Sequence, residues 1–184
     1  MFELALYGGA FNPPHAGHAQ VMIEAAARAK RVLVAPSFRH PYGKRMADYP
    51  LRLSWLESIV EHIRPLCGGD IAVSRVEQQL AREIDGPIYS YTLLAHLAES
   101  LALDGKQIAL VVGEDIAQLL PSFYRGEELL ERFSIMCIEE TIHVRSTAIR
   151  QRLALGEALP SQWMAPGMNP VNYDLYAAHG NSHA

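Results

Sequence analysis

The stretch that decides the fold is Gly8-Gly9-Ala10-Phe11-Asn12-Pro13-Pro14-His15-Ala16-Gly17-His18, which directly follows a short apolar run. Two glycines end a predicted strand, and two histidines open a predicted helix. Glycine lets the backbone approach a ligand closely, and the first turn of a helix presents unpaired N–H groups to an anion. The stretch therefore predicts a phosphate-handling site at which the two imidazoles take part in chemistry.

Apolar strands alternate with amphipathic helices along the rest of the chain. The expected strands are Glu3–Tyr7, Arg31–Pro36, Ile71–Val73, Gln107–Val112 and Ser134–Ile138. The expected helices are Gly17–Ala29, Leu51–Ile63, a helix capped by Ser90 and running to Leu101, Ile116–Leu120, Glu127–Arg132, a helix opened by Ser146 or Thr147 and closed by Gly156, and Asn169–Ala178. This alternation predicts parallel strands with right-handed crossovers. We expect an α/β fold: a Rossmann-like three-layer architecture, with residues 1–184 as one domain around a mostly parallel sheet of five or six strands.

Polar or glycine-containing segments follow four of the expected strands. These segments are residues 8–18, 36–44, 113–115 and 146–150. Ligands of open parallel sheets bind beyond the carboxyl ends of the strands. We therefore expect the four segments to meet at one edge of the sheet, around a single ligand site.

The bulk composition limits the function classes. Hydrophobic residues make up 49% of the chain and charged residues 20%, with a net charge of −4, so no basic footprint for nucleic acid is expected. Cys67 and Cys137 lack metal-ligand spacing and are expected to be free thiols. The N-terminus lacks a signal-peptide pattern, and no apolar stretch reaches membrane-spanning length, so we expect a cytoplasmic protein that does not bind membranes.

The two histidines alone leave three interpretations open. Their spacing on a helix is compatible with a metal pair, but no carboxylate or thiol lies close in sequence to complete the ligand set. They are also compatible with ordinary surface or capping residues. The surrounding glycines and prolines favour the third interpretation, in which imidazoles donate hydrogen bonds to phosphate oxygens during group transfer.

Residues 8–18 resemble the first signature of the nucleotidyltransferase superfamily, in which glycines, a phenylalanine, a proline and two histidines recur in this order. Three further motifs match in order: Ser90-Tyr91-Thr92, Gly113-Glu114-Asp115 and Ser146-Thr147-Ala148-Ile149-Arg150. The match covers nearly the whole chain. It is most similar to the nicotinate or nicotinamide mononucleotide adenylyltransferases, and it implies the nucleotidyltransferase version of the Rossmann-like fold.

The resemblance implies adenylyl transfer from ATP to a pyridine mononucleotide, releasing pyrophosphate. The catalytic residues it implies are His15, His18, Lys44 and Arg150. The ATP-binding residues it implies are Gly8, Gly9, Ala10, Phe11, His15, His18, Gly113, Asp115, Ser146, Thr147 and Arg150. Magnesium is implied as an ion that arrives with ATP, held by phosphates and water rather than by a metal site built from the protein.

The same resemblance implies a mononucleotide site, in which Phe123 stacks on the pyridine ring and Thr92 contacts its carboxylate or amide. The mononucleotide-binding residues are Asn12, His40, Lys44, Thr92, Phe123 and Tyr124. No pattern in the sequence distinguishes the carboxylate from the amide, and none indicates an oligomeric state.

Several positions depart from the family pattern. Arg145 stands where the late motif has a first serine, Phe123 where tryptophan is typical, and the segment between the fifth strand and Ser146 is short. The loop from His40 to Lys44 is closer to a tyrosine-x-lysine form, and Arg52 is expected to be either structural or phosphate-facing. Two alternatives therefore remain: adenylyl or cytidylyl transfer to another phosphorylated metabolite such as phosphopantetheine, or a nucleotide sensor without catalysis.

Overall fold

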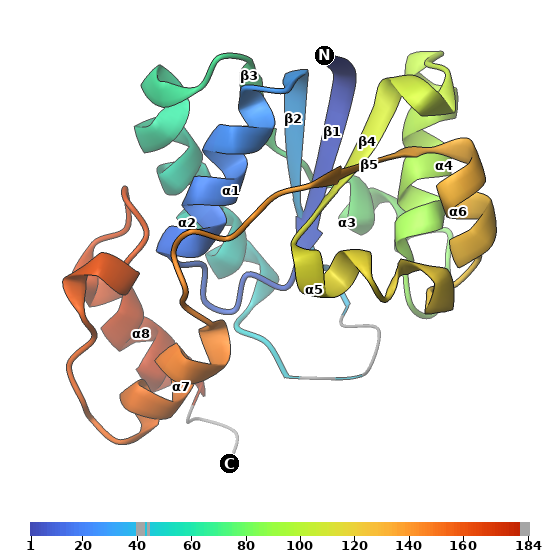
Figure 1. The fold of residues 1–184 in the computed structure, drawn as a ribbon. Helices are drawn as coiled ribbons and strands as arrows, with labels where there is room; N and C mark the ends of the chain where they lie inside the picture. Colours follow the sequence, from blue (N-terminus) through green and yellow to red (C-terminus); the bar gives the residue numbers. More distant parts are fainter. Residues whose placement is uncertain (40–42, 44, 181–184) are drawn as a thin grey trace.

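A five-stranded sheet forms the centre of the computed structural model, which describes residues 1–39, 43 and 45–180 (Figure 1). The strands are β1 (Phe2–Gly9), β2 (Ala29–Pro36), β3 (Asp70–Val73), β4 (Ile108–Val112) and β5 (Ser134–Cys137). Their order is β3-β2-β1-β4-β5, and every neighbouring pair is parallel. The predicted α/β class and Rossmann-like architecture are confirmed, with five strands in the described part of the chain.

Helices pack on both faces of this sheet (Figure 1). They are α1 (Ala16–Ala26), α2 (Tyr49–Ile63), α3 (Val76–Leu80), α4 (Ser90–Leu101), α5 (Glu114–Ala117), α6 (Gly126–Arg132), α7 (Ser146–Ala154) and α8 (Pro170–Gly180), with 3₁₀ turns at Arg64–Leu66, Gly105–Gln107, Leu120–Ser122 and Ser161–Trp163. None of the helices in the described ranges is long and apolar enough to cross a membrane.

The strands are apolar on both faces because each face is covered by helices. Along β4, Ala109 and Val111 belong to the core shared with α1 and α2, whereas Leu110 belongs to the core shared with α4 and α6. This period of two places successive side chains in opposite cores. The core on the α1 side continues into α7 and α8, so the C-terminal helices are packed onto the sheet domain rather than tethered to it.

Several predicted boundaries were wrong, for local reasons. Gly8 and Gly9 belong to β1 rather than following it, because they pair with Ala35 and Pro36 of β2. Helix α1 ends at Ala26, three residues earlier than expected, because β2 already begins at Ala29.

Two helix starts also differ from the prediction. Ser90 is the first residue of α4 rather than its cap, since Tyr89 holds the extended backbone of the N-cap position. The helix expected at Ile116–Leu120 is α5, which starts directly after Gly113, and a 3₁₀ turn follows it at Leu120–Ser122. The short helix α3 was not predicted at all, and its five residues are too few to show a helical period.

Arg52 of α2 is a structural residue, which settles the alternative left open by the sequence. Its side chain is 1% exposed, and its three nitrogens donate to the carbonyl oxygens of Ala10, Ser37 and Ala47 at 2.8–2.9 Å. These carbonyls belong to the segments that leave β1 and β2 and to the segment that enters α2. One buried guanidinium therefore holds together the backbone at the carboxyl edge of the sheet.

We expect Arg52→Met to lower the free energy of unfolding by about 3–5 kcal/mol, because it leaves three carbonyls without their donor. Urea denaturation followed by circular dichroism measures this loss. Arg64→Met is the control: Arg64 is exposed and its ion pair with Asp70 spans 3.9 Å, so its loss should stay below about 1 kcal/mol. Equal losses for the two variants would contradict the role assigned to Arg52.

Candidate functional site

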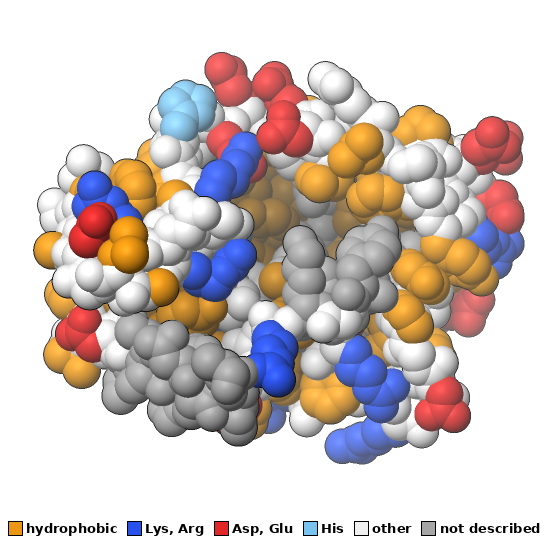
Figure 2. All heavy atoms as spheres, turned by 90° about the horizontal axis from the view of Figure 1, so that it is seen from below, with side chains coloured by type: hydrophobic (Ala, Val, Ile, Leu, Met, Phe, Trp, Pro, Cys, Tyr) orange, Lys and Arg blue, Asp and Glu red, His pale blue; other side chains and the backbone are white. Residues whose placement is uncertain are grey.

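The strand order places a cleft between the ends of β1 and β4. The chain leaves β1 towards β2 on one side and leaves β4 towards β5 on the other, so the two connections diverge. A cavity of about 290 Å³ lies there, lined by Gly8 and Gly9, by residues 110–112, by residues 88–90 and by residues 122–124. Figure 2 shows this edge of the sheet, where a hollow with an apolar floor is bordered by basic side chains and, at one end, by acidic ones.

The loop from Ala10 to Pro14 is held by side chains that are distant in sequence. The carbonyl oxygens of Asn12, Pro13 and Pro14 accept hydrogen bonds at 2.8–2.9 Å. Their donors are Arg150 and Ser146 of α7 and Tyr173 of α8. The first and last motifs of the chain, more than a hundred residues apart, are thus brought into direct contact.

The imidazoles of His15 and His18 stack on each other at this meeting point. Their centroids lie 3.7 Å apart, and the backbone N–H of His15 donates to Nδ1 of His18 at 3.1 Å. Because Nδ1 of His18 accepts a hydrogen bond, its proton lies on Nε2 in the neutral form. Nδ1 of His15 is buried and has no hydrogen-bond partner among the described residues.

Both imidazoles are neutral at pH 7. Burial lowers the pKa of His15 to about 4, and the nearby charge of Arg145 acts in the same direction. Burial, followed by the neighbouring His15 and then Arg145, lowers the pKa of His18 well below its usual value. The pair therefore offers N–H hydrogen-bond donors rather than resident positive charge.

Gly17 allows residues 139–145 to lie close against α1. A Cβ at this position would lie 3.0 Å from the carbonyl oxygen of Ile142 and 3.1 Å from the ring of His15. The amide of Gln20 also binds this segment, donating to the carbonyl of Glu139 and accepting from the N–H of Thr141. The connection into α7 is therefore fixed beside the imidazoles.

Phe11 adopts a backbone conformation that is rare for its residue type. Its φ is +47°, its side chain is buried, and its ring meets the ring of His18 edge to face at 4.9 Å. A left-handed φ costs energy in a residue other than glycine and persists only where the surroundings enforce it. Here the strained turn orients the ring that supports His18.

Aromatic side chains form one wall of the cavity. Phe123 and Tyr124, which the resemblance assigns to the mononucleotide, line it, and Tyr124 stacks on Tyr89 with centroids 4.7 Å apart. Thr92 lies in the first turn of α4, yet the residues that line the cavity from this helix are Ser90 and Leu93. The aromatic wall suits a flat ring, as π-faces stack at such distances.

A buried carboxyl group, that of Glu77, also lines the cavity. It accepts a hydrogen bond from the backbone N–H of Phe38 at 2.8 Å. Burial raises the pKa of Glu77 to about 7, although the Phe38 bond and the nearby Arg52 oppose this shift.

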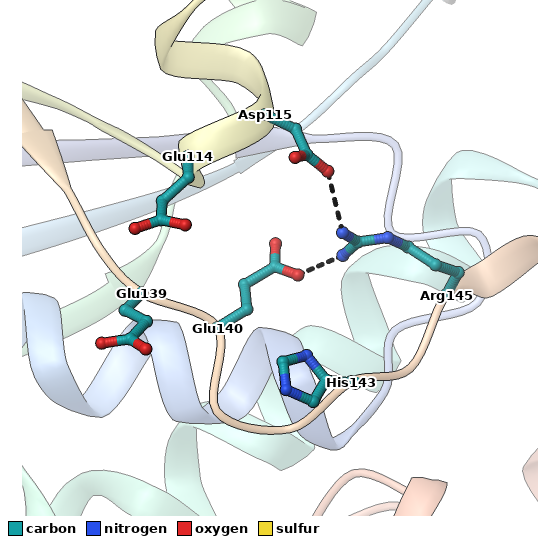
Figure 3. Close-up of a pocket in the computed structure, with 6 residues that line it drawn as sticks. All are labelled: Glu114, Asp115, Glu139, Glu140, His143 and Arg145. Carbon is teal, nitrogen blue, oxygen red and sulfur yellow. Dashed lines mark hydrogen bonds and ion pairs between the residues drawn. The ribbon is translucent and has the colours of Figure 1, made fainter.

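Two other predicted residues have protein partners. The amide of Asn12 donates to the carbonyl of Arg45 and accepts from the N–H of Ala47, so it holds the loop that precedes α2. Asp115, in the first turn of α5, is exposed and forms an ion pair with Arg145 at 3.1 Å, shown in Figure 3. The predicted residues His40 and Lys44 lie outside the described residues.

Sequence reasoning missed four contributors to this edge of the sheet. They are Tyr89, Glu77, Tyr173 and Glu140, which pairs with Arg145 beside the predicted Asp115. Tyr89 stands next to a recognised motif, which was an available signal. Glu77 and Tyr173 carried none, since their roles arise from contacts between elements far apart in the chain.

Comparisons with known proteins agree with this geometry. A family model described as cytidylyltransferase-like matches residues 6–153. A protein of Anaeromyxobacter dehalogenans named probable nicotinate-nucleotide adenylyltransferase is 33% identical over 170 residues, covering 84% of this chain and 86% of its own. A protein of the same name from Myxococcus xanthus is 30% identical, covering 85% and 84% respectively.

Two solved structures have a fold similar to that of this chain. A candidate nicotinate-nucleotide adenylyltransferase from Vibrio parahaemolyticus superposes with a TM-score of 0.73 at 29% identity, covering 96% of this chain and 99% of its own. A Plasmodium falciparum nicotinic acid mononucleotide adenylyltransferase complexed with NaAD gives 0.74 at 15% identity, covering 99% and 97%. At that identity the second likeness shows the fold alone.

The buried His15 gives the stability of the protein a defined pH dependence. The pKa of His15 is about 4 in the folded state against an unfolded value of 6.5, so the unfolded chain binds more protons between these values. The contribution of His15 is complete above pH 6.5 and is lost as the pH falls towards 4. Between pH 7 and pH 5, we expect the free energy of unfolding to fall by about 2 kcal/mol less in His15→Gln than in the wild type.

The comparison with a variant is needed because Glu77 acts with the opposite sign. Its folded pKa of about 7 exceeds the unfolded value of 4.5, so its destabilising effect is complete above pH 7 and declines as the pH falls to 4.5. Urea unfolding at the two pH values measures each loss. His143→Gln, at an exposed histidine, is the control. Its free energy of unfolding should fall by as much as that of the wild type between the two pH values. An equal fall in the free energy of unfolding for His15→Gln and the wild type would rule out the effect of burial on the pKa of His15.

Proposed function

Because this chain belongs to the cytidylyltransferase-like family, we propose that it transfers the adenylyl group of ATP to nicotinate mononucleotide. The supporting observation is the contact between the loop that leads into the imidazole pair and the start of α7, beside a cavity with an aromatic wall. The names of the relatives support the pyridine nucleotide as acceptor and the dinucleotide of NAD synthesis as product. The alternative acceptors and the sensor interpretation have no comparable support.

In the proposed reaction, a phosphate oxygen of the mononucleotide attacks the α-phosphorus of ATP. A new P–O bond forms in line with the bond to the β-phosphate, which breaks and releases pyrophosphate. Such transfers need little covalent chemistry from the protein, and catalysis comes from positioning and electrostatic stabilisation. The Nε2–H of His18 and the ring of His15 would donate to the phosphate oxygens on which charge builds.

Two helix starts would hold the polyphosphate. The first turns of α1 and α7 offer backbone N–H groups that have no partner within the helix. From α7, Thr147 and Arg150 add a hydroxyl and a guanidinium, which already lie 3.0 Å from each other. The backbone of residues 8–11 would pack along the nucleotide, Asp115 would accept hydrogen bonds from its ribose, and Lys44 would add a further cation.

The mononucleotide would occupy the cavity, with its pyridine ring stacked on Phe123. The carboxylate of the ring would be bound by backbone N–H groups at the start of α4, where Tyr89 provides no side-chain cap. Thr92 lies in that turn. The proposed role of Asn12 is indirect, because its amide holds the loop before α2; His40 would act from that loop.

Magnesium would enter the site as part of the ATP complex. Among residues 1–39, 43 and 45–180, no group of three or more His, Cys, Asp or Glu side chains is arranged to hold a metal ion. The oxygen ligands that Mg²⁺ prefers would instead come from the phosphates and water. The ion offsets the charge of the triphosphate, and the imidazoles and α7 supply the remaining hydrogen bonds.

Pyrophosphate release tests the proposal. The protein with ATP and Mg²⁺ should release pyrophosphate with nicotinate mononucleotide faster than with nicotinamide mononucleotide, and not with phosphopantetheine. His18→Asn should lower the turnover number by about 10²–10³-fold, because Asn lacks a group at the place of Nε2. Its amide oxygen can still accept from the N–H of His15, so the fold should persist.

Circular dichroism and urea unfolding of His18→Asn provide the control for folding. Release with neither pyridine mononucleotide would refute the proposed function, and release with phosphopantetheine alone would replace the acceptor. Near wild-type turnover in His18→Asn would refute the role of Nε2 while leaving the reaction in place.

We expect Phe123→Ala to raise the KM for the mononucleotide by about tenfold or more, while the KM for ATP changes little, because the lost stacking concerns only the pyridine ring. Steady-state kinetics with each substrate varied in turn separate the two effects. Phe2→Ala, at the opposite end of β1, is the matched control and should leave both constants unchanged. An equal loss for both substrates would contradict the placement of the ring.

A further inference from the structure

Arg145 is a cation beside the imidazoles to which the reaction described above gives no role. It occupies the N-cap position of α7, and no side-chain hydrogen bond caps that helix. The preceding Val144 is buried, and Gln20 clamps the same segment to α1. The backbone of Arg145 is thus fixed in place, while its side chain is 58% exposed.

The guanidinium of Arg145 lies between two carboxylates. Figure 3 shows it reaching from the segment before α7 towards Asp115 of α5 and Glu140, while Glu114 and Glu139 point elsewhere. The contact with Asp115 spans 3.1 Å, and a second ion pair joins it to Glu140. Asp115 is 82% exposed, so its pairing with Arg145 is screened by water. Exposed ion pairs of this kind contribute little to stability and are readily exchanged.

The same guanidinium also acts on the imidazole pair. Its positive charge contributes to the lowered pKa of both His15 and His18, which shows that it lies within electrostatic range of them. It stands directly before Ser146, whose hydroxyl binds the loop that carries the two histidines. Arg145 therefore lies within reach of the carboxylates on one side and of the proposed phosphate position on the other.

We propose that Arg145 binds the polyphosphate of the nucleotide, and that Asp115 and Glu140 hold its guanidinium until the nucleotide arrives. This inference rests on the proposed function, since it takes ATP as the ligand. An arginine binds phosphate oxygens through two parallel hydrogen bonds, which are stronger than the exposed contact of Arg145 with Asp115. The exchange also frees the carboxylate of Asp115 for the ribose hydroxyls, so that phosphate and ribose recognition become coupled.

Binding of AMP, ADP and ATP to Arg145→Ser tests the proposal. Serine is a favourable N-cap residue, so α7 should be retained. Isothermal titration calorimetry with Mg²⁺ at one ionic strength should show ATP affinity reduced by about ten- to a hundred-fold, ADP affinity reduced less, and AMP affinity changed little. Glu140→Gln removes one competitor for the guanidinium and should bind ATP several-fold more tightly than the wild type.

Arg75→Ser is the matched control. Arg75 is also an N-cap residue, is also 58% exposed, and forms a comparable ion pair with Glu57 at 3.3 Å. Its replacement should leave all three affinities unchanged.

Three outcomes would overturn the proposal. Equal losses for AMP, ADP and ATP would show that Arg145 acts on the ribose through Asp115. Wild-type affinities in Arg145→Ser, in a protein that still releases pyrophosphate, would refute this inference alone. A wild-type protein that neither binds ATP nor releases pyrophosphate would refute both the inference and the proposed function.

Discussion

The carbonyl groups of the loop between β1 and α1 impose the constraint on which the site depends. A loop cannot pair these acceptors within itself, and leaving them buried without donors would be costly. The donors come from three other elements: Arg52 of α2, Arg150 and Ser146 of α7, and Tyr173 of α8. The loop can adopt its course only when the whole chain has folded around it. The imidazoles therefore reach their positions as a consequence of tertiary structure.

The electrostatics of the site follow from the same packing. Burial keeps His15 and His18 neutral, so the protein does not have to confine two positive charges against each other before a ligand arrives. The guanidinium of Arg145 is meanwhile balanced by carboxylates. A site organised in this way offers donors to an anion without a large desolvation cost in the unliganded state.

The parallel sheet explains why the sites proposed for the two substrates lie at the same edge. At the switch point between β1 and β4 the crossovers run in opposite directions, and the space between them is lined by chain from both halves of the protein. The imidazoles and α7 lie on the β1 side, whereas the aromatic wall of Tyr89, Phe123 and Tyr124 comes from the segments that flank β4. The segments proposed for phosphate binding and for ring recognition are thus different parts of the chain that meet at one edge.

The sequence alone determined the α/β class, the strands and the motif residues, because apolar periodicity and turn residues are local properties. It also indicated that the segment around His15 and the segment around Ser146 would meet, since both follow parallel strands. Only the tertiary structure decided that Arg52 is structural, that Asn12 holds a loop, and that Glu77 lines the cavity. The physical reason is that burial and hydrogen-bond partners depend on contacts between distant residues, which no local pattern encodes.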